Sequence, residues 1–193
     1  TLARRPDGGW LLAVETTGVV PINIRVHAFD DTDALLAGRI ARSVDLPNSL
    51  SRWAEGTPHF RSIEMSPDLD HSIIEIGLHY FRDAVVDRMA VGTLVDFEKW
   101  TATVTPTINH LLQGAGLTGG FGDRDAFRWR GRDLLILEGE LIRRDWGSWR
   151  SFLFEPATRT LTALLPRTAG GSRSLSNPTA SVVRHPSGAG LAL

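Results

Sequence analysis

Two histidines and a glutamate recur at a spacing of four residues, which is the clearest metal-ligand pattern in the chain. On a helix, His71, Glu75 and His79 would project from one face. Imidazole and carboxylate groups are ligands that first-row divalent metals use. His71 and His79 would lie about 12 Å apart along the axis, so only neighbouring pairs could share an ion. We name the three as candidate metal ligands. The alternative, which the polar face of any surface helix favours, is a solvated surface without function.

Three residues are candidates for acid–base catalysis. His79 and Asp83 repeat the four-residue spacing, and His110 precedes a glycine-rich loop. A histidine serves as a general base near neutral pH when a carboxylate orients it. The sequence shows no such partner for His110, so its ordinary interpretation is a helix histidine with a local hydrogen bond. Neither G-x-S-x-G nor H-E-x-x-H occurs, which removes two common hydrolase signatures.

The loop after His110 matches a dinucleotide-binding motif by its letters alone. Gly114 to Gly119 reads GAGLTG, and the motif G-x-G-x-x-G binds pyrophosphate where a strand feeds a helix N-terminus. Here a helical pattern comes before the glycines, and no helix start follows them. We therefore expect a flexible connector. No cofactor is predicted, apart from a divalent metal at the histidines named above.

Tryptophan and arginine gather around one turn near the middle of the second half. Trp146 and Trp149 flank a Gly-Ser pair, with Arg144 and Arg150 beside them. Trp and Arg are the residues enriched at interface hot spots, so these four are candidates for binding a ligand or a partner. Cross-strand packing and ion pairs on a solvated sheet face explain the same pattern equally well.

Composition limits the class of partner. The 193 residues carry 21 basic and 22 acidic side chains, a net charge of −1. This balance argues against a nucleic acid held by its phosphates and against an anionic membrane surface. No apolar run approaches the roughly 20 residues that span a bilayer. A protein or a small molecule is the expected partner, and nothing in the composition indicates an oligomeric state.

Cysteine usage and the first residue bear on localisation. The chain has no cysteine, which excludes disulfides and thiolate sites and fits a cytoplasmic protein. The chain starts at Thr1 and not at Met, which is compatible with a truncated N-terminus or a removed signal peptide.

One long helix is expected in the middle of the chain. Ser66-Pro67 is a cap followed by a proline at the first helical position, and Gly92 would end the helix at about residue 91. At 100° per residue, most apolar side chains of this segment share one face: Ile73, Ile74, Gly77, Leu78, Phe81, Ala84 and Val85. The pattern predicts an amphipathic helix over 67–91 that packs on a sheet.

Shorter elements complete the predicted fold. Strands are expected over 9–16 and 22–29, short helices from residues 31, 48 and 106, and consecutive antiparallel strands over 126–165. The sequence therefore predicts a single α+β domain over 1–193, with a helix-rich middle (31–114), a strand-rich C-terminal half (126–193) and the 67–91 helix on one face of an antiparallel sheet.

Two functions follow from these patterns. The first is a soluble ligand- or protein-binding module without an intact catalytic motif, which uses the sheet edge and the Trp146–Trp149 turn. The alternative is a small enzyme that uses histidine and carboxylate groups, or a metal, in a pocket between the 67–91 helix and the sheet.

Overall fold

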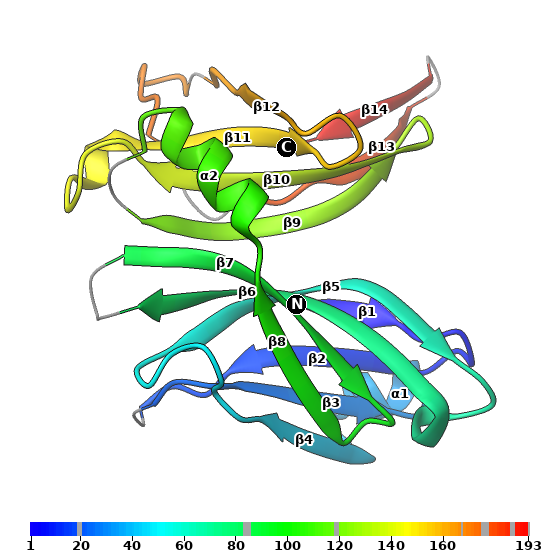
Figure 1. The fold of residues 1–193 in the computed structure, drawn as a ribbon. Helices are drawn as coiled ribbons and strands as arrows, with labels where there is room; N and C mark the ends of the chain where they lie inside the picture. The colour runs from blue at the N-terminus through cyan, green and yellow to red at the C-terminus, as the bar shows by residue number, and fades with distance from the viewer. Residues whose placement is uncertain are drawn as a thin grey trace. The chain divides into compact units, whose positions relative to one another are not determined.

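The protein is built almost entirely from antiparallel β-sheets. The computed structural model describes residues 1–18, 21–82, 86–117, 120–166, 168–174, 178–185 and 188–192. Three four-stranded sheets and one two-stranded sheet occur in these ranges, and the chain divides into two compact units, 1–105 and 106–193 (Figure 1). The predicted α+β class is therefore wrong. The expectation of a single domain over 1–193 stays a prediction.

Unit 1 holds two of the four-stranded sheets. The first pairs β1 (Leu2–Arg4), β2 (Trp10–Glu15), β3 (Ile24–Phe29) and β4 (Arg42–Leu46) in chain order. The second pairs β5 (Glu55–Met65), β6 (Ser72–Arg82), β7 (Val86–Val95) and β8 (Lys99–Val104) in the same manner. Helix α1 (Thr32–Leu36) joins β3 to β4, and the single turn η1 (Leu69–His71) joins β5 to β6.

One hydrophobic core lies between these two sheets. Buried side chains from β2, β3 and β4 meet side chains from β6 and β7: Leu11, Val26 and Leu46 on one side, and Ile74, Ile76, Leu78 and Leu94 on the other. All seven are at most 1% exposed. Unit 1 is therefore a β-sandwich, and its outer faces and strand edges are the places where sites can form.

The predicted helix over 67–91 does not exist. Its first turn is η1, and β6 and β7 occupy the rest of its described residues. In β6, Ile74, Ile76, Leu78 and Tyr80 face the core, whereas Ile73 is 47% exposed. The same apolar letters fit both periods, 3.6 and 2.0, and three isoleucines favour the strand because branched side chains suit a pleated sheet.

Two shorter predicted helices also need correction. The helix expected from residue 31 ends at Leu36, and Arg42–Leu46 forms the strand β4. The helix expected after Asn48 is a loop that a buried side chain holds. One carboxylate oxygen of Glu55 accepts hydrogen bonds from the backbone N–H groups of Ser49, Leu50 and Ser51, at 2.5 to 3.0 Å. These three donors are satisfied without a helix.

Unit 2 contains the strands expected over 126–165. After helix α2 (Pro106–Gly114) come β9 (Phe121–Trp129), β10 (Arg132–Glu140), the turn η2 (Trp146–Ser148), β11 (Trp149–Glu155) and β12 (Thr160–Ala163). The sheet order is β12-β11-β10-β9. Strands β13 (Ser181–His185) and β14 (Gly188–Ala192) form a separate hairpin. Within the described ranges, no helix has the length and apolar character needed to cross a bilayer.

Candidate functional site

The turn between β10 and β11 in unit 2 is held by its own side chains. Asp145 accepts a hydrogen bond from the backbone N–H of Gly147 at 2.9 Å. The hydroxyl of Ser148 accepts from the backbone N–H of Ile142 at 2.9 Å and donates to the Ile142 carbonyl at 3.0 Å. Asp and Ser form such local bonds readily because their side chains are short. These hydrogen bonds hold the turn in one conformation. A turn that is already ordered would lose less conformational entropy on binding a ligand.

The two tryptophans of this turn differ in burial. Trp149 is 8% exposed, whereas Trp146 is 79% exposed. Their rings stack with centroids 6.1 Å apart and an interplanar angle of 26°, a geometry that favours aromatic pairs. The buried ring of Trp149 thus packs against one face of the Trp146 ring, and most of the Trp146 side chain is exposed to solvent.

Two exposed arginines precede Trp146 in this turn. Arg143 and Arg144 are exposed, and no carboxylate of the described residues lies within ion-pair distance of either. Arg150 differs, because its guanidinium donates to the carbonyls of Gly147 and Trp149 at 3.0 and 2.7 Å. Arg150 therefore stabilises the turn, while Arg143 and Arg144 remain available to a ligand.

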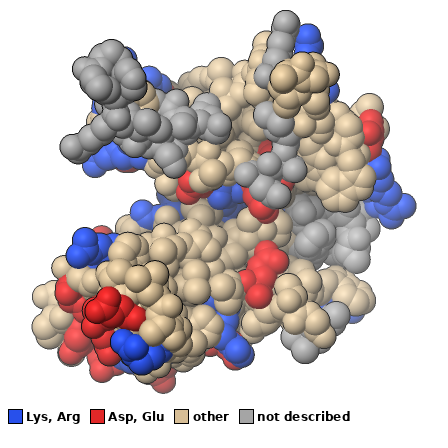
Figure 2. All heavy atoms as spheres, turned by 180° about the vertical axis from the view of Figure 1, so that it is seen from behind, with Lys and Arg blue, Asp and Glu red and all other residues tan. Residues whose placement is uncertain are grey.

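The two units carry net charges of opposite sign, although the charge of the whole chain is nearly balanced. Unit 2 carries eleven arginines against seven Asp and Glu residues, a formal charge of +4. Unit 1 carries ten basic against fifteen acidic residues, a charge of −5, and acidic side chains gather on part of it in Figure 2. An anionic partner is thus electrostatically suited to unit 2.

The predicted row of metal ligands is not brought together. Glu75 and His79 lie four residues apart on β6, about 13 Å along a strand that rises 3.3 Å per residue. His71 lies in η1, where its Nδ1 is 2.8 Å from Asp68, and this hydrogen bond raises the pKa of His71 above its usual range. Among the described residues, no three His, Asp or Glu side chains form a group able to hold a metal. The helical premise for the row was wrong.

The catalytic candidates occupy separate places. His110 is exposed on α2, and Asp83 lies outside the described residues. His79 does find a carboxylate, through an intermediary that the sequence analysis missed. The Thr57 hydroxyl is 2.8 Å from Nε2 of His79 and donates to Glu15 at 3.1 Å.

The conformation of Thr57 explains why this contact was missed. Its φ of 45° is rare for a branched residue, and a β-bulge spans this part of β5. The only sequence signal was the Gly-Thr-Pro segment at 56–58, where a glycine and a proline interrupt a strand. The resulting contact can relay a proton between an imidazole and a carboxylate.

Comparisons with family models, curated proteins and solved structures find no match for this chain.

Proposed function

We propose that this protein is a non-catalytic binding module that binds an acidic, partly apolar protein segment through the Trp146 turn. The contact surface consists of Trp146, Ile142, Arg143 and Arg144. We further propose that it works in the cytoplasm, because the chain has no cysteine. The proposed partner is neither a nucleic acid nor a membrane.

The exposed stack of Trp146 on Trp149 carries the proposal. An indole that is 79% exposed costs hydration free energy unless a partner covers it. Ile142, 61% exposed on the same turn, adds to the apolar contact. Trp and Arg are the residue types enriched at interface hot spots. The charge of unit 2 and the two unpaired guanidiniums favour carboxylates on the partner.

Peptide binding tests the proposal directly. The probe is a short fluorescent peptide that alternates Glu and Leu, and the measurement is fluorescence anisotropy against the full chain. We expect saturable binding that weakens about tenfold or more in Trp146→Ala, as expected for a hot-spot residue. The double variant Arg143→Gln/Arg144→Gln should weaken binding and reduce its dependence on salt.

Trp53→Ala is the matched control, because Trp53 is 41% exposed in unit 1 and also lies beside an arginine. It should bind the peptide like the unmodified protein. Equal losses in Trp146→Ala and Trp53→Ala would remove the Trp146 turn as the site. Equal affinity for a peptide that alternates Lys and Leu would remove the preference for acidic segments.

A second candidate function, acid–base catalysis, rests on the Glu15–Thr57–His79 contact. A hydroxyl between an imidazole and a carboxylate can accept and pass a proton. The helix that was expected to wall a pocket over 67–91 is not formed, since β6 and β7 occupy that segment. A substrate would therefore approach these residues at the surface of the sandwich. Hydrolysis of p-nitrophenyl acetate that disappears in His79→Gln, but persists in His110→Gln, would favour this function. Equal rates in both variants and in buffer would eliminate it.

A further inference from the structure

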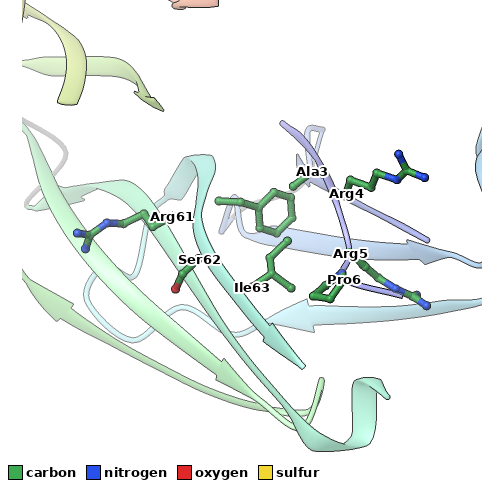
Figure 3. Close-up of a pocket in the computed structure, with 8 residues that line it drawn as sticks. Ala3, Arg4, Arg5, Pro6, Arg61, Ser62 and Ile63 are labelled. Atoms are coloured by element: carbon green, nitrogen blue, oxygen red, sulfur yellow. The ribbon is translucent and has the colours of Figure 1, made fainter. Parts of the chain in front are cut away.

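A groove of about 380 Å³ lies in unit 1 where the edges of its two sheets meet. Two continuous segments line it: residues 3–6, which include the end of β1, and residues 60–63 of β5 (Figure 3). β1 and β5 are the edge strands of their sheets, and no ladder of hydrogen bonds joins them in the described chain. The groove is therefore an unpaired seam of the sandwich. Its volume is at the lower end of the range for small-molecule sites.

The groove combines an apolar floor with a basic rim. Phe60 and Ile63 are partly buried and pack against the core, so they form a preformed apolar surface. Arg4 and Arg61 are exposed, and in Figure 3 they stand on opposite sides of Ile63. Such a surface suits a molecule with an apolar body and a charged end.

The three arginines of the groove differ in their availability. Arg5 is 9% exposed and binds Asp7 with two hydrogen bonds, so its charge is neutralised. Arg4 lies over the ring of Trp10, with 5.9 Å from its guanidinium carbon to the ring centroid. Neither Arg4 nor Arg61 forms an ion pair with any residue that the structure describes. Two uncompensated guanidiniums flank one groove in a unit whose net charge is −5.

The edges of the groove are built in a way that opposes an added peptide strand. β1 has three residues and leads into Pro6, which has no N–H to donate. The register of β5 shifts between Phe60 and Ser62, so Arg61 occupies a β-bulge. Short strands, proline, charge and bulges are the devices that block edge pairing. A small molecule is thus a better fit for the seam than an extended chain.

We propose that this groove binds a small organic carboxylate with an apolar body of aryl or medium-chain alkyl type. The apolar body lies on Phe60 and Ile63, and the carboxylate pairs with the guanidinium of Arg61, whose fork matches two oxygens. This site is separate from the Trp146 turn and does not depend on it.

The proposal is tested with naphthalene-2-carboxylate, followed by the indole N–H signals in ¹H–¹⁵N NMR spectra of the full chain. The Trp10 signal reports on the groove because Trp10 lies against Arg4, and the Trp146 signal reports on the other site. We expect a saturable shift of Trp10 and little change at Trp146. The affinity should fall about tenfold in Arg61→Gln, a loss typical of one charge-assisted hydrogen bond.

Three comparisons make the result decisive. Arg39→Gln removes an exposed, unpaired arginine elsewhere in unit 1 and should leave the affinity unchanged. Naphthalene-2-carboxamide, which keeps the shape without the charge, and inorganic phosphate, which lacks the apolar body, should both bind more weakly. Equal binding of the carboxamide, equal binding of phosphate, equal losses in Arg39→Gln and Arg61→Gln, or an unmoved Trp10 signal would overturn the proposal. None of these results bears on peptide binding at Trp146.

Discussion

The imidazole ring of His59 lies directly over the Cα atom of Gly77 on the neighbouring strand. The two residues form a register pair of β5 and β6, and a Cβ atom on Gly77 would overlap the ring. His59 is 3% exposed, so the ring has little room to move. A Cβ atom on Gly92 would likewise overlap the partly buried ring of Trp100 on β8. Glycine is favoured at both positions because an aromatic ring fills the space of its missing side chain.

Gly77→Ala should therefore destabilise the protein. The ring of His59 or the backbone of β6 must shift to admit the methyl group, and such overpacking costs about 1–3 kcal/mol. Urea unfolding followed by circular dichroism measures the change. Gly114→Ala is the control, because Gly114 ends α2 with open space around it, and it should be neutral or slightly stabilising. Equal stability of Gly77→Ala and the unmodified protein would contradict the packing described here.

Glu55 should contribute more to stability than its single charge suggests. Its carboxylate is 2% exposed and is the acceptor for three backbone N–H groups. Glu55→Ala leaves these donors without an acceptor, which should cost about 3 kcal/mol or more. Glu55→Gln keeps an acceptor oxygen but loses the charge, so about 1–2 kcal/mol is expected. Glu64→Gln, at an exposed position of the same strand, should lie within about 0.5 kcal/mol of the unmodified protein.

Replacing each of the two stacked tryptophans should lower the unfolding free energy by a different amount. Trp149→Ala removes a buried ring and should cost about 3–5 kcal/mol of unfolding free energy. Trp146→Ala loses only the stacking contact, about 0.5–1.5 kcal/mol. Urea unfolding of both variants checks the order. Similar losses in the two variants would mean that Trp146 is part of the core, and the proposed binding surface would lose its basis.

His71 should titrate above the usual histidine range, and Asp68 is the main cause. The hydrogen bond from His71 to Asp68 favours the protonated ring and raises its pKa. While Asp68 is ionised, the pair therefore stabilises the fold fully below about pH 6.5, the unfolded value for histidine, and the effect disappears as pH rises through the folded pKa of His71. NMR titration of the ring protons should show the His71 pKa fall in Asp68→Asn.

His27 supplies the internal control for that titration. Burial, followed by repulsion from Arg25, lowers the pKa of His27. It should titrate below His71 and stay unchanged in Asp68→Asn. A His71 pKa that is insensitive to Asp68→Asn would show that the 2.8 Å contact does not persist in solution.

Elements were predicted correctly where the sequence pattern fitted only one kind of secondary structure. The strands over 126–165 and the helix at Pro106 were predicted because apolar runs and a Thr-Pro start had no competing explanation. The 67–91 segment failed because Ile73, Ile74, Gly77 and Leu78 fit a helical face, while Ile74, Ile76, Leu78 and Tyr80 fit a strand face equally well. Period alone cannot decide between two fits. Pairing with β5 and β7, which are contacts between distant residues, decides for the strand.

The same limit applies to the sites. The sequence identified Trp146 and Trp149 as candidates for a binding site. That Trp149 is buried and Trp146 is exposed depends on the path of the turn, which the sequence does not reveal. Thr57 meets His79 only because β5 pairs with β6, and Glu15 joins them from β2. The groove flanked by Arg4 and Arg61 depends on two edges that are far apart in the chain. Contacts of this kind leave no local signature.

The chain-order pairing of the sheets has a consequence for how the protein assembles. Every ladder among the described strands joins neighbours along the chain, from β1-β2-β3-β4 through β5-β6-β7-β8 to β9-β10-β11-β12. Each sheet can thus grow by adding one hairpin at a time, with short loops and a small closure entropy. The first sheet of unit 1 keeps its core face uncovered until β5–β8 have been synthesised, because the two sheets bury one core between them.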